Sequence, residues 1–195
     1  MWSNFKLENY DYLLIIDLEA TCSSDGTVPR HEMETIEIGA VIADAKSFDV
    51  LGETSIFIKP IMHPELTEFC KELTSITQND VDNGVGFPEA MMRLGDFIES
   101  TVGWDRSGVF CSWGAFDKNL FHKDCILHNI EYPFSDEHVN LKTAFSLNQG
   151  RKKQYGTLKA LRICGMEFEG DHHRGIDDAR NMARMLPFIF GDKEV

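Results

Sequence analysis

The chain has 195 residues, of which 43% are hydrophobic and 26% charged, a balance that suits one globular domain with a full core. Its formal charge of −13 argues against a protein that holds nucleic acid by bulk electrostatic attraction. No apolar run approaches the ~18 residues of a membrane-spanning helix, and the N-terminal residues lack a secretory signal. Five scattered cysteines without a zinc-site spacing predict reduced thiols, so we expect a cytoplasmic protein with no membrane partner.

The N-terminal part of the chain predicts three strands. Residues 12–21 predict a buried strand by their length and β-branching, with a continuous apolar run over residues 12–16. Residues 34–44 alternate and then become continuously apolar, and residues 50–60 form a third candidate strand that ends at a proline. Three consecutive strands favour an antiparallel meander.

Helical spacing begins at residue 63. Apolar residues recur there at steps of three, four and three, which predicts a helix over residues 63–77 with one apolar face. That predicted face consists of Leu66, Phe69, Leu73 and Ile76. Residues 77–88 are typical of a loop, and residues 87–101 predict a helix with Pro88 in its first turn.

The C-terminal half predicts alternating strands and helices. Residues 107–113 form a short buried strand that runs towards Asp117, and residues 117–130 a helix with a weak apolar stripe of Leu120, Cys125 and Ile126. Residues 138–150 predict a strand that enters a helix. The alternation indicates an α/β domain of three layers, with helices on both sides of a central sheet.

Two further helices complete the predicted elements. Residues 155–166 form a short helix that ends at a glycine, and residues 175–190 the last helix. The apolar face of that last helix consists of Ile176, Ala179, Met182, Ala183 and Leu186. We see no linker or repeat, so residues 1–195 are expected to form a single domain.

Two acids follow the apolar run of the first strand. Strand side chains alternate between faces, so Asp17 and Glu19 point the same way and Leu18 points to the other face. Two adjacent carboxylates repel each other, and a divalent cation between them removes the repulsion. A D-x-E pair is also common on ordinary protein surfaces, and the buried strand before it makes a metal site an equal alternative.

Asp117 and the segment HHRGIDDARN supply further candidates. Asp117 follows a second buried strand, although an aspartate there can also cap a helix. In the segment, His173 pairs with Asp178 and His172 with Asp177 at the same spacing. Helical phase favours Asp178 next to the buried face and Asp177 as a solvent or capping residue. A histidine beside a metal cluster can act as a general base.

Basic residues are concentrated in one stretch. Residues 138–166 carry six basic side chains and no acidic one, whereas the rest of the chain has 13 basic residues against 32 acidic ones. The six are Lys142, Arg151, Lys152, Lys153, Lys159 and Arg162. The stretch either guides a polyanion or forms a solvated loop and helix face.

Together, DLEAT, SWGAFD and HRGIDDARN resemble the three motifs of the DEDDh 3′→5′ exonucleases. The resemblance implies an RNase H-like three-layer fold, with a mixed central sheet flanked by helices, and nucleotide-by-nucleotide hydrolysis from a 3′ end. It places the motif acids on Asp17, Glu19, Asp117 and Asp178, which would hold two Mg²⁺ or Mn²⁺ ions. The family histidine directly precedes RGIDDARN, which selects His173 as the base and Asp178 as its acid.

The resemblance also suggests a substrate. HPELTEFCKELTSITQNDVD and HRGIDDARNMARM are similar to the Eri-type subgroup, which trims RNA ends, so single-stranded RNA is the expected substrate and 5′-mononucleotides the products. Glu19, Thr21 and Trp113 lie where they could contact the terminal nucleotide, and Trp113 is either stacked on a base or a core residue at a strand end. The additional N-terminal nucleic-acid-binding domain of many subgroup members is expected to be absent, and no protein partner is predicted.

Two other functions compete with this interpretation. The first is a DNA 3′→5′ exonuclease of the proofreading or repair type, which would use the same site. The second is a non-catalytic nucleic-acid-binding module that kept the fold. The presence of all five motif residues argues against the second, and degradation of matched RNA and DNA oligonucleotides distinguishes the first.

Overall fold

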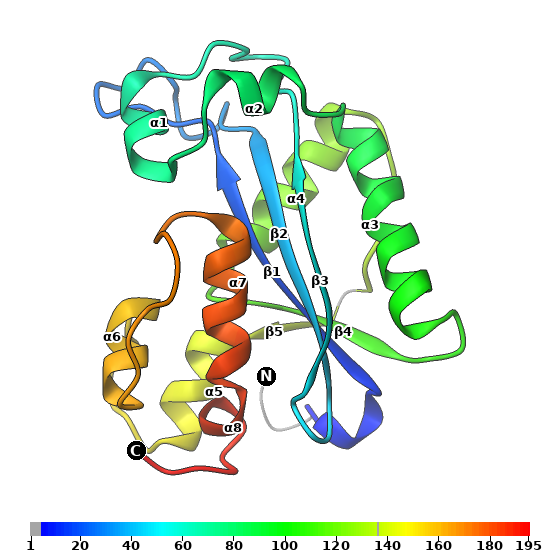
Figure 1. Ribbon diagram of the computed structural model, residues 1–195, viewed down its shortest axis with the longest axis vertical. Coiled ribbons are helices and arrows are strands. Elements are labelled where there is room, and N and C mark those ends of the chain that lie inside the picture. The colour runs from blue at the N-terminus through cyan, green and yellow to red at the C-terminus, as the bar shows by residue number, and fades with distance from the viewer. Residues whose placement is uncertain (1–4, 136) are drawn as a thin grey trace.

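A five-stranded mixed sheet forms the centre of the molecule, which a computed structural model describes over residues 5–135 and 137–195 (Figure 1). The strands lie in the order β3-β2-β1-β4-β5. Their bounds are β1 Tyr12–Ala20, β2 Thr35–Asp44, β3 Val50–Phe57, β4 Gly108–Ser112 and β5 His138–Asn140. β1, β2 and β3 pair antiparallel, which confirms the predicted meander, and β4 and β5 add in parallel.

Helices cover both faces of this sheet, and the predicted α/β three-layer architecture is confirmed (Figure 1). Their bounds are α1 Glu68–Thr74, α2 Gln78–Asp82, α3 Phe87–Val102, α4 Phe116–Leu127, α5 Leu141–Asn148, α6 Thr157–Ile163, α7 Gly175–Arg184 and α8 Leu186–Ile189, with a 3-10 turn at Leu7–Asn9. Among the described residues, no helix is both long and apolar enough to cross a bilayer.

The alternation of side chains along β1 divides the core in two. Leu13 and Ile15 pack with α5, α7 and α8, whereas Leu14 and Ile16 pack with α3 and α4. Because odd-numbered residues of β1 face α7, the same alternation turns Asp17 towards that helix. The core therefore fixes the direction of the first candidate acid.

Two glycines let α7 lie directly against the sheet. A Cβ atom on Gly39 of β2 would lie 1.9 Å from the carbonyl carbon of Gly175, and one on Gly175 would lie 2.9 Å from the carbonyl oxygen of Asp17. No side chain fits in either space. This close approach brings the first turn of α7 beside the acids of β1.

The region before α3 differs from the prediction. Leu66 and Ile76 are buried but lie outside α1, while Phe69 and Leu73 are largely exposed, so the predicted apolar face is wrong. Thr67 caps the start of α1, and Ser75 ends it in the left-handed conformation with a φ of 57°. The predicted loop over residues 77–88 contains α2, which a reciprocal capping box nucleates.

Two helices in the C-terminal half also differ from the prediction. Ile126 is 81% exposed, and Phe121 takes its place in the core face of α4. The last predicted helix divides at Met185 into α7 and α8 because Pro187 has no N–H to continue the ladder. Its predicted apolar residues are nevertheless all buried. The five cysteines are free, as expected.

Candidate active site

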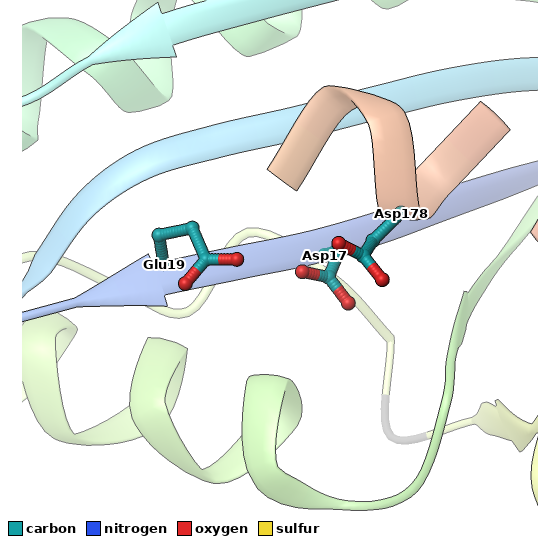
Figure 2. A group of neighbouring side chains, drawn as sticks. All are labelled: Asp17, Glu19 and Asp178. Carbon is teal, nitrogen blue, oxygen red and sulfur yellow. The ribbon is translucent and has the colours of Figure 1, made fainter. Parts of the chain in front are cut away.

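Three carboxylates from two elements form one cluster. Asp17 and Glu19 extend from β1, and Asp178 extends from the first turn of α7, with one oxygen of each within 4.8 Å of the others (Figure 2). Glu19 and Asp178 are buried, and Asp17 is partly buried. The structure thus brings together the three acids that the sequence placed 161 positions apart at most.

Burial and mutual repulsion make this cluster costly when all its members are charged. Burial, followed by the charge of Asp178, raises the pKa of Glu19 to about 9. Burial likewise raises the pKa of Asp178 to about 7, and it moves the pKa of Asp17 well above its ordinary value. Hard divalent cations prefer such buried oxygen ligands, and their charge would offset the repulsion. The cluster therefore fits a Mg²⁺-like ion.

Asp117 adds a fourth carboxylate at the edge of β1. The ladder between β1 and β4 ends at Ile15 and Cys111, which leaves the later N–H groups of β1 without a strand partner on that side. Asp117 Oδ1 accepts the N–H of Leu18 at 3.0 Å, between Asp17 and Glu19 in the chain. Its charge contributes, after burial, to the raised pKa of Asp17.

The position of Asp117 in α4 tests the alternative that this aspartate caps the helix. Asp117 is the second residue of α4, whose N-cap is Ala115, so it is not the capping residue. Burial raises its own pKa to about 6, because little water reaches the carboxylate. The structure therefore places Asp117 beside the cluster, where the metal prediction requires it.

The two candidate aspartates of the third motif have different surroundings. Asp178 joins the cluster, and its Oδ2 accepts the backbone N–H of His173 at 2.8 Å. Asp177 accepts from Arg180 Nη1 at 2.8 Å and from the backbone N–H of Asp171 at 3.0 Å. The geometry supports Asp178 as the motif acid and Asp177 as a surface acid.

Both histidines of that motif lie close to Asp178. His172 Nε2 lies 3.7 Å from Asp178 Oδ1, and the His172 and His173 rings are in contact, with centroids 3.9 Å apart. His173 binds Asp178 through its backbone and takes a left-handed φ of 69°, which positions its side chain differently from that of a helical residue. Burial lowers the pKa of both imidazoles, which favours the neutral, proton-accepting form.

Comparison with known proteins assigns the family of this site. The family model described as Exonuclease matches residues 14–186, which include every residue of the site described so far. The chain belongs to this exonuclease family.

Relatives of the chain include both sequences and solved structures. It is 29% identical to human "3'-5' exoribonuclease 1" over 194 residues, which cover 97% of this chain and 55% of that protein. The chain thus spans about half the length of that relative. Its fold superposes on the nuclease domain of 3'hExo, "a DEDDh family member, bound to rAMP", with a TM-score of 0.83 and 27% identity, covering 94% of this chain and 93% of that domain.

A third relative was solved with its target. The structure described as "3'-end specific recognition of histone mRNA stem-loop by 3'-exonuclease" matches with a TM-score of 0.86 and 27% identity, covering 94% of this chain and 64% of that one. These matches confirm the resemblance to DEDDh exonucleases and the fold inferred from it.

A buried acid that sequence reasoning missed holds the loop that carries His173. Glu37 lies opposite Glu19 in the β1–β2 register and is fully buried. Its Oε2 accepts from Arg174 Nε at 3.2 Å and from the N–H of Gly175 at 3.1 Å. Its Oε1 accepts from the hydroxyl of Ser55 at 2.7 Å. An acid inside the apolar run TIEIGAV was the available signal.

These contacts give Glu37 a positioning role. Arg174 is the N-cap residue of α7, so the contacts hold the start of the helix that carries Asp178. They also hold the residue that directly follows His173. Because Arg174 and Gly175 both bind the buried Glu37 carboxylate, the spacing between the His173 loop and the acid cluster is preserved.

The structure gives packing roles to two residues that were predicted to contact the substrate. Thr21 is 2% exposed, and its hydroxyl accepts the N–H of Glu34 at 2.9 Å. The indole N–H of Trp113 donates to Tyr155 O at 3.0 Å, and its ring packs against Phe145 in the core. The geometry therefore does not support base stacking by Trp113.

An exposed aromatic residue directly precedes the fourth carboxylate in the chain. Phe116, directly before Asp117, is 38% exposed. It lines a cavity of about 360 Å³ together with Met33, Arg30 and Lys123. An exposed aromatic ring beside the exposed Arg30 cation is chemically suited to a nucleotide, whereas Lys123 Nζ is buried against Asp124.

Proposed function

We propose that the protein is a metal-dependent 3′→5′ exonuclease that hydrolyses single-stranded nucleic acid, with RNA as its substrate, and releases 5′-mononucleotides. One observation carries the proposal: buried Asp17, Glu19 and Asp178 meet in one cluster, beside Asp117, in a chain of the exonuclease family. We propose further that residues 1–195 act as a single nuclease domain.

The four acids are the proposed ligands of two ions, Mg²⁺ or Mn²⁺. When bound, such a pair neutralises charge on the attacking and leaving oxygens of an in-line displacement. Asp17 and Asp178 would hold the ions from opposite elements, and Asp117 from the edge of β1. The acidic body of the protein does not then oppose substrate binding, because the metal charge offsets the carboxylates at the scissile phosphate.

His173 is the proposed general base. It lies on the loop that Asp178 and Glu37 hold in place, and its lowered pKa keeps the imidazole neutral near pH 7. It would take a proton from the water that attacks the terminal phosphodiester. His172 shares that loop and its ring lies within 3.7 Å of an Asp178 oxygen, so any test of the base must include both histidines.

Preference for RNA is supported by the exoribonuclease relatives. The test is degradation of two single-stranded oligonucleotides of one sequence, one of ribose and one of deoxyribose, each 5′-labelled and incubated with Mg²⁺. RNA should shorten faster, one nucleotide at a time. A third oligonucleotide, RNA with a single deoxynucleotide at its 3′ end, shows whether the terminal 2′-hydroxyl carries the preference.

Each outcome of this test has a defined meaning. Faster loss of the DNA strand would replace the RNA assignment with that of a DNA 3′ exonuclease. Binding of both strands without metal-dependent release of mononucleotides would mean a non-catalytic binding module. Asp178→Asn is the inactive control, and Asp177→Asn is its matched control, because it removes a neighbouring surface acid.

A further inference from the structure

We propose that the α5–α6 cationic surface binds the phosphate backbone of the substrate strand upstream of its 3′ end. This surface comprises α5, the loop after it and α6, and its cations are Lys142, Arg151, Lys152, Lys153, Lys159 and Arg162. The proposal rests on the proposed function, since it concerns the same substrate.

Ion pairing distinguishes these cations from the others. Over residues 5–135 and 137–195, at least eight of the 13 other lysines and arginines form ion pairs with acidic side chains. In the same part of the chain, none of the six does. A protein with 32 acids has many available partners, so the exposed members of this set, Lys152, Lys153, Lys159 and Arg162, remain available to an external anion.

The surface begins at the active site. Lys142 lies in the first turn of α5, and its Nζ is 3.8 Å from the point that a Cβ on Gly114 would occupy. Gly114 precedes Asp117 by three residues, so Lys142 lies beside the segment that carries the fourth acid. A nucleic-acid strand whose 3′ end lies at the four acids therefore meets Lys142 before the other five cations.

The loop between α5 and α6 is fixed beside Lys142. Ser146 Oγ donates to Lys153 O at 3.2 Å, and Gln154 Nε2 donates to Thr143 Oγ1 at 3.0 Å, so two bonds tie the loop to α5. A third ties it to β4, from the Trp113 indole N–H to Tyr155 O. The packing role of Trp113 thus holds this loop against the strand that leads to Asp117.

The remaining exposed cations lie on that loop and on α6. Lys152, Lys153 and Lys159 are exposed, and Lys159 Nζ lies 5.1 Å from the centroid of the Tyr155 ring. α5 and α6 lie on the same side of the sheet as α7, which carries Asp178 (Figure 1). Exposed cations on one side of the sheet match successive phosphates of a single strand, which carry no base information.

The test compares two variants that lose the same charge. Lys152→Ala/Lys153→Ala/Lys159→Ala removes three exposed cations of the surface. The matched control, Lys6→Ala/Lys46→Ala/Lys59→Ala, removes three exposed lysines outside this surface. Binding of a 5′-labelled 20-nucleotide single-stranded RNA is measured by fluorescence anisotropy in EDTA between 50 and 200 mM salt, so the readout does not require catalysis.

The surface variant should bind about 10- to 100-fold more weakly at 100 mM salt, and the slope of log affinity against log salt should fall by up to ~2, or ~0.7 per lost phosphate contact. The control should keep the wild-type slope. Equal losses in both variants would overturn the proposal, because they would show a general charge effect. Unchanged binding in both would overturn it equally.

A short substrate separates this proposal from the proposed function. A dinucleoside monophosphate has only its scissile phosphate and none for the surface, so wild type and surface variant should cleave it at the same rate with Mn²⁺. A variant that loses this cleavage would place the lysines in folding or in the active site and overturn the proposal. If wild type cleaves neither substrate but the binding difference holds, the proposed function fails and the surface stands.

Discussion

Replacing Asp178 with asparagine is expected to stabilise the metal-free protein at pH 8. Asparagine keeps an oxygen for the His173 N–H but removes one charge from the cluster. Burial raises the pKa of Asp178 from its ordinary value of 3.8 to about 7. When the pKa of an acid is higher in the folded state than in the unfolded state, the protein loses stability as pH rises, here from about pH 4 to about pH 7.

The size of the effect follows from that interval. A pKa of about 7 in place of 3.8 lowers the unfolding free energy by about 4 kcal/mol above pH 7, at about 1.4 kcal/mol for each pKa unit. This is a ceiling, because neighbouring acids share the protons and asparagine makes a weaker hydrogen bond. A domain of this size gains roughly 2–4 °C in melting temperature per kcal/mol, so a rise of several degrees is expected.

Thermal unfolding in EDTA at pH 4.5, 6 and 8 measures this effect. The difference between Asp178→Asn and wild type should be small at pH 4.5 and largest at pH 8. With millimolar Mg²⁺ the advantage of the variant should shrink by about 2.7 kcal/mol, because a ligand bound only by the native state at about 100 times its Kd adds that amount to the wild type. Asp177→Asn should keep the metal response, and an Asp178→Asn protein less stable than wild type in EDTA at pH 8 would refute the reasoning.

Three further substitutions test the residues around the cluster. His173→Ala should lower kcat by about 10²–10⁴-fold, whereas His172→Ala should keep most activity, and the reverse order of the two variants would move the base to His172. Wild-type activity should rise with pH around a midpoint below 6.5, because burial lowers the His173 pKa. Glu37→Gln should lower kcat by about 10- to 100-fold with KM nearly constant, since it loosens the loop that carries His173. The pH midpoint of its activity should shift because a nearby charge is lost. A change in KM alone would contradict the positioning role. Phe116→Ala should raise KM on RNA by about 5- to 150-fold, the worth of ~1–3 kcal/mol for one stacked base, while Phe116→Tyr should restore it; an unchanged KM would exclude stacking there.

Sequence patterns predicted the cluster because its members obey local rules. Alternation along β1 fixed the common direction of Asp17 and Glu19, and helical phase in α7 favoured Asp178 over Asp177. The meander followed from three β-branched runs. Each of these signals comes from a short segment, and the hydrophobic core then brought the segments together.

Other features depend on contacts between distant segments. The paired N–H donors of Arg174 and Gly175 hold Glu37 in the core from 137 and 138 positions away, which no local pattern reveals. The predicted stripe in α1 failed because packing buries Leu66 and Ile76 outside the helix. The sequence left Trp113 between a base contact and a core residue, because it does not show its partner, the carbonyl of Tyr155.

The most direct test of the account follows the products of a single strand labelled at its 5′ end, with purified protein and Mg²⁺. The account predicts a ladder that shortens one nucleotide at a time from the 3′ end, with release of 5′-mononucleotides, no reaction in EDTA and none with Asp178→Asn. Cleavage at internal positions, or equal degradation by Asp178→Asn, would contradict the assignment of Asp17, Glu19 and Asp178 as the catalytic metal site.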